Sequence, residues 1–153
     1  VLFLCENNQY GMSMASDKAV AGESIASRGN SYGIESIQID GNDVEAVFES
    51  VTSFKNEILA SNRPKFIEAV TYRYRGHSKS DRNLYRTSDE IEYWKEEKDP
   101  IKRYIGKLIE SGVTEAKLKE IDEGVKELIR DSVKKALDSP MSPVTNLEED
   151  SYA

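Results

Sequence analysis

The chain has 153 residues, of which 21 are Lys or Arg and 28 are Asp or Glu, so its net charge is −7 with the single histidine neutral. This length suits one domain, and the acidic balance argues against nucleic acid as a partner because phosphate binding needs a basic face. No apolar run approaches the roughly 18 residues of a membrane span, and one cysteine excludes an intrachain disulfide. The composition predicts a soluble, cytoplasmic domain.

The chain opens on an apolar run, residues 1–5, of the continuous kind that is typical of buried strands in parallel sheets. No initiator Met and no basic leader precede this run. We therefore expect the sequence to be a fragment whose upstream half is absent.

Two further β-rich runs occupy residues 34–39 and 66–71, and a helix is predicted between them. Asn42 and Glu45 have the spacing of a capping box, and an apolar stripe continues to residue 59 before Asn-Arg-Pro ends the helix. A strand, a helix and a strand over this distance form a right-handed βαβ unit, which requires a parallel sheet. The predicted fold class is therefore α/β.

From residue 87 onward the chain is charged and helical. Thr87 and Glu90 form a second predicted capping box, and the Asp-Pro pair at 99–100 starts another helix. Thr114 then opens a long amphipathic helix that must end before Pro140. We divide the chain into residues 1–86 and a helical region, 87–153, packed on the same domain.

Two long, weakly periodic stretches each follow a predicted strand: residues 6–33, the first loop, and residues 72–86, the second loop. Open α/β sheets bind ligands at the carboxyl ends of their strands. We therefore expect both loops to emerge at one edge and to form a composite site.

The first loop begins Glu-Asn-Asn-Gln-Tyr-Gly at residues 6–11. Amide and carbonyl oxygens suit a hard cation such as magnesium. The alternative is a simple turn in which Gly11 supplies a positive φ angle, and the residues alone favour that alternative.

The second loop carries two guanidiniums, Arg73 and Arg75, which can grip phosphate, together with His77, the only imidazole of the chain. Its place after a strand and behind Gly76 supports a functional role for His77. The alternative is an exposed histidine without a role. Cys5 ends a predicted buried strand, so we interpret it as an inert core residue.

Residues 5–12, CENNQYGM, and residues 72–81, YRYRGHSKSD, resemble the alpha subunit of thiamine-diphosphate-dependent 2-oxo acid dehydrogenases, a family that includes the pyruvate, branched-chain and acetoin enzymes. The resemblance covers nearly the whole chain. It implies that residues 1–86 are the C-terminal part of the parallel-sheet thiamine-diphosphate-binding domain. Residues 87–153 would be its amphipathic C-terminal helices.

The resemblance also implies roles for single residues. The end of the family's cofactor motif matches Asn7-Asn8, so the Asn8 side-chain oxygen and the Tyr10 carbonyl would be magnesium ligands. His77 would be catalytic, near the reacting centre. The implied cofactor-binding residues are Asn8, Tyr10, Gly11, Arg73 and His77.

Ser78 matches a position that is phosphorylated in mitochondrial relatives. The second loop departs from the mitochondrial pattern at Arg75, Lys79 and Arg82, and its GHSKSD run resembles bacterial acetoin-dehydrogenase-type subunits more closely. This departure weakens the case for regulation by phosphorylation.

The first part of the cofactor motif, Gly-Asp-Gly, occurs nowhere in the 153 residues and would lie before Val1. The resemblance places a further cofactor contact, a glutamate, on a separate beta subunit. We therefore expect the isolated chain to be inactive, to bind no thiamine diphosphate with magnesium, and not to be a stable monomer.

The function that the resemblance implies is decarboxylation of a pyruvate-like 2-oxo acid, or cleavage of acetoin, with transfer of the acyl group to lipoyl. The implied partners are a beta subunit in a heterotetramer and a lipoyl-bearing acyltransferase within a multienzyme complex, with neither nucleic acid nor membrane. The alternative is a non-catalytic, acidic subunit-interaction module, or an inactive fragment of the enzyme.

Overall fold

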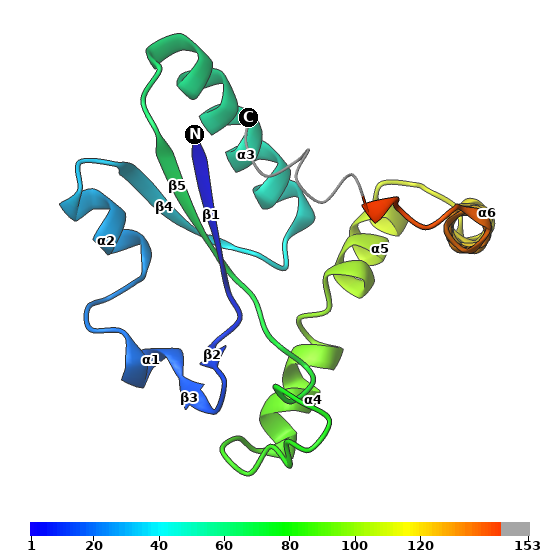
Figure 1. The fold of residues 1–153 in the computed structure, drawn as a ribbon, viewed down its shortest axis with the longest axis horizontal. Coiled ribbons are helices and arrows are strands. Elements are labelled where there is room, and N and C mark those ends of the chain that lie inside the picture. The colour runs from blue at the N-terminus through cyan, green and yellow to red at the C-terminus, as the bar shows by residue number, and fades with distance from the viewer. Residues whose placement is uncertain (145–153) are drawn as a thin grey trace. The chain divides into compact units, whose positions relative to one another are not determined.

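The computed structural model describes residues 1–144, and the chain divides into two compact units, Val1–Leu108 and Ile109–Ala153. The first unit is built on a parallel sheet of three strands in the order β1-β5-β4 (Figure 1). The strands are β1 (Leu2–Asn7), β4 (Glu35–Asp40) and β5 (Lys65–Val70). The predicted α/β class with a parallel sheet is confirmed. The division at residue 86 stays a prediction.

Helices cover both faces of the central strand β5. Successive side chains of a strand point to opposite faces, so β5 contacts a different helix on each side. Lys65 lies over the Phe54 ring of α3 (Val44–Ser61) and pairs with carboxylates from β4 and α3. Glu68, on the other face, accepts a hydrogen bond from the amide of Ala26, which begins α2 (Ala26–Ser31). Gly29 of α2 lies so close to β4 that a Cβ there would stand 2.1 Å from Ser36 Oγ. The central strand is therefore covered on both sides.

Strand β1 is an edge strand of this sheet, paired with β5 alone among the described residues. Phe3 is 46% exposed and Leu4 is 52% exposed. The prediction of a fully buried strand at residues 1–5 is therefore wrong for this chain. An apolar run shows that a strand suits burial, but a second neighbour has to supply the burial.

The first loop contains more regular structure than its weak periodicity predicted. A short hairpin of β2 (Tyr10–Gly11) and β3 (Met14–Ala15) leads into α1 (Ser16–Ala19), and α2 follows. The positive φ angles of this hairpin belong to Gln9 (73°) and Met12 (56°). The predicted positive φ at Gly11 is wrong, since Gly11 pairs in the extended strand β2.

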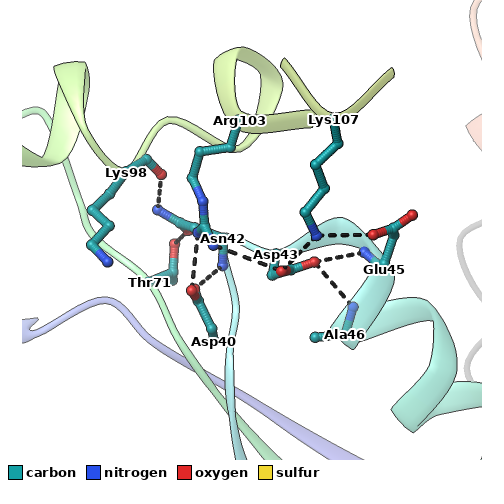
Figure 2. Close-up of polar contacts among 9 residues, drawn as sticks. All are labelled: Asp40, Asn42, Asp43, Glu45, Ala46, Thr71, Lys98, Arg103 and Lys107. Carbon is teal, nitrogen blue, oxygen red and sulfur yellow. Dashed lines mark hydrogen bonds and ion pairs between the residues drawn. The ribbon is translucent and has the colours of Figure 1, made fainter. Parts of the chain in front are cut away.

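The α3 helix begins one residue later than its predicted capping box. Asp43 is the N-cap, and its Oδ1 accepts from the amides of Glu45 and Ala46 (Figure 2). Hydrogen bonds to Lys107 and to these amides lower the pKa of Asp43. Asp43, and not Asn42, therefore caps the first turn of α3, and the Asn42 side chain bonds elsewhere.

Asn42 is only 3% exposed and joins three segments of the first unit. Its Nδ2 donates to the carbonyl of Lys98 at 2.7 Å, and its Oδ1 accepts from Thr71 Oγ1 at 2.6 Å (Figure 2). The side-chain amide of Asn42 therefore connects three segments: the end of β4, Thr71 directly after β5, and the turn before α5. This contact anchors the start of the second loop.

The remaining helices are α4 (Ser88–Glu96) and α5 (Pro100–Glu110), and in the second unit α6 (Glu115–Asp138). Their predicted starts are confirmed: the Thr87, Asp99 and Thr114 side chains each accept amide hydrogens of the first turn. The α6 helix ends before Pro140, as predicted. None of the helices formed by residues 1–144 is long and apolar enough to span a bilayer.

Candidate functional site

The two loops leave the sheet at the same edge. β1 and β5 are parallel neighbours, with Asn7 opposite Val70 at their carboxyl ends. Beyond the strands the contact continues, because the Thr71 amide donates to the Asn7 carbonyl at 2.9 Å and the Arg73 amide to the Asn8 carbonyl at 3.3 Å. The shared edge predicted from the strand order is confirmed.

The Asn8 side chain is held by the turn that it begins. Its Oδ1 accepts the amide hydrogen of Tyr10 at 3.1 Å. A carbonyl oxygen has two lone pairs, so this bond leaves acceptor capacity on Oδ1 for a further partner. Gly11, the other predicted cofactor contact here, is exposed and has no atom within 4 Å of the place where a Cβ would stand.

The neighbouring Asn7 belongs to the framework under this turn. Its Nδ2 donates to Glu68 Oε1 at 2.7 Å, while Glu68 Oε2 accepts from the Ala26 amide at 2.8 Å. Glu68 is fully buried, with 0% exposure. Because a buried carboxylate needs donors, Asn7 and Ala26 hold it in place, and Glu68 in turn fixes the end of β1.

Arg73, predicted to contact the diphosphate, crosses between the two loops. Its Nη2 donates to the Met12 carbonyl at 2.5 Å and to Tyr85 Oη at 2.9 Å. Its Nε is buried and has no hydrogen-bond partner among the described residues. A buried guanidinium donor without an acceptor is costly, so this atom fits an anionic ligand that supplies an oxygen.

Arg86 lies at the centre of an aromatic cluster that the sequence reasoning missed. The residue is 8% exposed, and its guanidinium donates to the carbonyls of Arg73 and Tyr74. The same group lies over three tyrosine rings at centroid distances of 5.3 to 5.7 Å, those of Tyr10, Tyr72 and Tyr85. These cation–π contacts tie the first loop to both ends of the second loop.

Glu90 and Trp94 of α4 complete this cluster. Tyr10 Oη and Tyr72 Oη both donate to Glu90 Oε1, at 2.7 and 2.8 Å. The Trp94 ring stacks on Tyr72 with centroids 5.0 Å apart. Two causes raise the pKa of Tyr10 to about 12: burial, which has the larger effect, and the hydrogen bond to Glu90. The phenols therefore remain protonated donors at neutral pH.

The middle of the second loop is exposed. The exposed residues include Arg75 and the run from His77 to Ser80. Asp81 organises the turn: its carboxylate accepts from the amides of His77 and Asn83, both at 2.8 Å, and from Tyr85 Oη. These bonds hold the pKa of Asp81 at about 2.

A cleft of about 430 Å³ joins this exposed turn to the first loop. Its lining includes His77 and Ser78 from the second loop and Met12 and Ser13 from the first. The structure therefore brings His77 to the same surface as the β2–β3 hairpin. Arg73 is connected to this surface by its hydrogen bond to the Met12 carbonyl.

The two predicted metal ligands at this edge, Asn8 and Tyr10, offer neutral oxygens. Within residues 1–144 no cluster of three or more His, Cys, Asp or Glu side chains could hold a metal ion. Asn8 and Tyr10 would thus contribute amide and carbonyl oxygens to a hard cation whose negative ligands come from another source. Burial and the nearby Glu68 and Glu6 carboxylates raise the pKa of Cys5, which agrees with an inert thiol.

Sequence reasoning missed Glu90 and Arg86 for identifiable reasons. Glu90 was assigned to a capping box, and only half of that box forms: Thr87 Oγ1 accepts the Glu90 amide, while the Glu90 carboxylate turns to the two phenols. Arg86 carried a usable signal, since three tyrosines, Tyr72, Tyr74 and Tyr85, flank arginines within residues 72–86. Trp94 of α4 packs onto Tyr72 of the loop.

The fold and the site define an α/β protein in which the loops that follow two parallel strands meet at one edge of the sheet. The family model of the dehydrogenase E1 component matches residues 1–145, and the chain belongs to that family. The resemblance drawn from the two loops, to alpha subunits of 2-oxo acid dehydrogenases, is confirmed.

Curated relatives extend over most of the chain. It is 37% identical over 151 residues to the pyruvate dehydrogenase E1 component subunit alpha of Rhizobium meliloti, covering 98% of this chain and 43% of the relative. It is 33% identical to the Rickettsia felis protein of the same name, over 99% of this chain and 47% of the relative. The mouse mitochondrial 2-oxoisovalerate dehydrogenase subunit alpha is 42% identical over 73% of this chain and 26% of its own length. The chain thus spans less than half the length of these relatives.

Proposed function

We propose that this chain forms part of the alpha subunit of a thiamine-diphosphate-dependent dehydrogenase that decarboxylates a pyruvate-like 2-oxo acid. The observation that carries the proposal is the buried, unpartnered Nε of Arg73 at an edge that also presents the Asn8 side-chain oxygen. Membership of the dehydrogenase E1 family supports the cofactor. The names of the relatives support a 2-oxo acid as substrate, and acetoin is the alternative.

Within this proposal each residue has a separate task. Asn8 Oδ1 and the Tyr10 carbonyl would hold Mg²⁺, and Arg73 Nε would donate to a diphosphate oxygen. When bound, thiamine diphosphate would supply a nucleophilic carbon and an electron sink for the loss of carbon dioxide from a 2-oxo acid. His77, exposed in the cleft, donates or accepts a proton near the reacting carbon. Gly11 leaves open space at the hairpin for the cofactor to approach.

The proposal includes the partners that this chemistry needs. A beta subunit supplies the rest of the cofactor site, and a lipoyl-bearing acyltransferase receives the acyl group. The cytoplasmic location predicted from the composition belongs to the same proposal. A non-catalytic interaction module is the competing function, and it predicts no cofactor binding at this edge.

Calorimetric titration of the assembled component with thiamine diphosphate and Mg²⁺ separates the two functions. Asn8→Ala removes one neutral metal ligand, and we expect it to weaken binding about tenfold or more without unfolding the protein. Asn56→Ala, on the exposed face of α3, is the matched control and should bind as the wild type does. Equal affinity of the Asn8 and Asn56 variants would remove Asn8 from the site. No binding by the wild type would favour the interaction module.

A further inference from the structure

One carboxylate oxygen of α4 gathers the two loops of the site. Glu90 Oε1 accepts the phenol hydrogen of Tyr10, 80 positions earlier in the chain, and that of Tyr72, 18 positions earlier. Both distances, 2.7 and 2.8 Å, are those of well-formed O–H···O hydrogen bonds. Glu90 is thus the point at which α4 and both loops meet.

The helix itself does not require this use of Glu90. Glu90 is the third residue of α4, where the side chain of a capping box returns to the N-cap backbone. Here the N-cap Thr87 accepts the Glu90 amide at 3.1 Å, and the carboxylate reaches the phenols instead. The long-range contacts are therefore what distinguishes Glu90 from an ordinary residue of a helix start.

Each phenol belongs to a residue whose backbone is linked to a proposed ligand residue. The Tyr10 amide holds the Asn8 side-chain oxygen, and Tyr72 directly precedes Arg73, whose Nε lacks a partner. Tyr72 is buried, stacked on Trp94 and edge-on to Tyr10 at a centroid distance of 6.1 Å. A shift of either ring moves the backbone that carries Asn8 or Arg73.

We propose that Glu90 is a positioning residue of the cofactor site, which by holding the Tyr10 and Tyr72 phenols fixes Asn8 and Arg73 at the spacing that a metal–diphosphate ligand requires. This inference rests on the proposed function. Glu90 touches neither the metal nor the diphosphate and acts through the tyrosines. Removing its carboxylate leaves the buried Tyr72 phenol and the half-buried Tyr10 phenol without their acceptor and lets the two loops shift independently.

The test uses the assembled component, with thiamine diphosphate and Mg²⁺ as the probe. Glu90→Ala should raise the dissociation constant at least about tenfold, the usual effect of losing a contact behind a metal ligand. Turnover at saturating cofactor should stay within about twofold of the wild type, because the reacting groups remain. Glu90→Gln, whose amide oxygen can still accept a phenol hydrogen, should recover most of the affinity. Glu92→Ala, exposed two residues further along the same helix, is the control.

Two further measurements keep the inference open to refutation. If Glu90→Ala fails to fold, the double variant Tyr10→Phe/Tyr72→Phe keeps the packed rings, removes both hydroxyls, and should show the same loss of affinity. Folded Glu90→Ala, or the folded double variant, with wild-type affinity would overturn the inference alone. Absence of binding in the wild type would overturn the proposed function and, with it, this inference.

Discussion

The two ends of the second loop and its middle differ sharply in how they are held. We define the loop base as Tyr72–Tyr74 with Tyr85–Arg86, and the loop tip as residues 75–82. In the base Tyr72 and Arg86 are buried, and base residues bond to the first loop and to α4. The tip is mostly exposed, and its contacts are local, around the Asp81 carboxylate. The part that would hold a diphosphate is therefore preformed, whereas the part that carries His77 is open to solvent and to substrate.

The largest expected effect is at the base. Arg86→Ala should lower the free energy of unfolding by about 3 kcal/mol, because it leaves two loop carbonyls without their charged donor and removes the cation beneath three tyrosine rings. Arg82→Ala, at the exposed tip of the same loop, should change stability by less than about 0.5 kcal/mol. Urea denaturation measures both, and equal effects would erase the distinction between base and tip.

The second effect is on activity and belongs to the tip. We expect His77→Ala to reduce turnover about 100-fold at saturating cofactor, the range of a lost proton-transfer group, while the fold and the cofactor affinity change little. The neighbouring Lys79→Ala is the control for changes at the exposed tip. Steady-state kinetics at saturating thiamine diphosphate gives the comparison, and wild-type turnover in the His77 variant would exclude the proton-transfer role.

The smallest expected effect is a loss of stability of the tip at acidic pH. The folded-state pKa of Asp81, about 2, lies below the value near 3.9 of an unfolded chain. The carboxylate therefore stabilises the turn above about pH 4, and this contribution disappears as the pH falls from about 4 towards 2. The exchange protection of the His77 and Asn83 amides, which donate to Asp81, should fall over this range in the wild type. In Asp81→Asn the protection should be low throughout, and wild-type protection in that variant would contradict the role of Asp81.

Strand and helix positions were predictable because they depend on local patterns. The apolar runs of β4 and β5, the stripe of α3 and the caps at Thr87 and Thr114 all act over a few residues. The shared edge of the loops followed from the parallel sheet that the βαβ unit imposes. These features required no knowledge of which distant side chains meet.

The polar contacts inside the site were not predictable in the same way. Asn42 and Glu90 both had the spacing of a capping box, and both are used for contacts with distant segments instead, to Lys98 and Thr71 in one case and to two phenols in the other. A spacing rule scores only the local partner, whereas the fold offers a buried partner that competes for the same atoms. Buried exceptions to such rules therefore mark where the site is built.

Hydrogen exchange of the assembled component, measured with and without thiamine diphosphate and Mg²⁺, tests the split between base and tip most directly. Peptides that cover Tyr72–Tyr74 should be protected without the cofactor, because the Arg73 amide already donates to the Asn8 carbonyl and Tyr72 is buried. Peptides that cover residues 75–82 should exchange fast and become protected only when the cofactor is added. A tip that is equally protected in both states, or a base that exchanges as fast as the tip, would contradict this account.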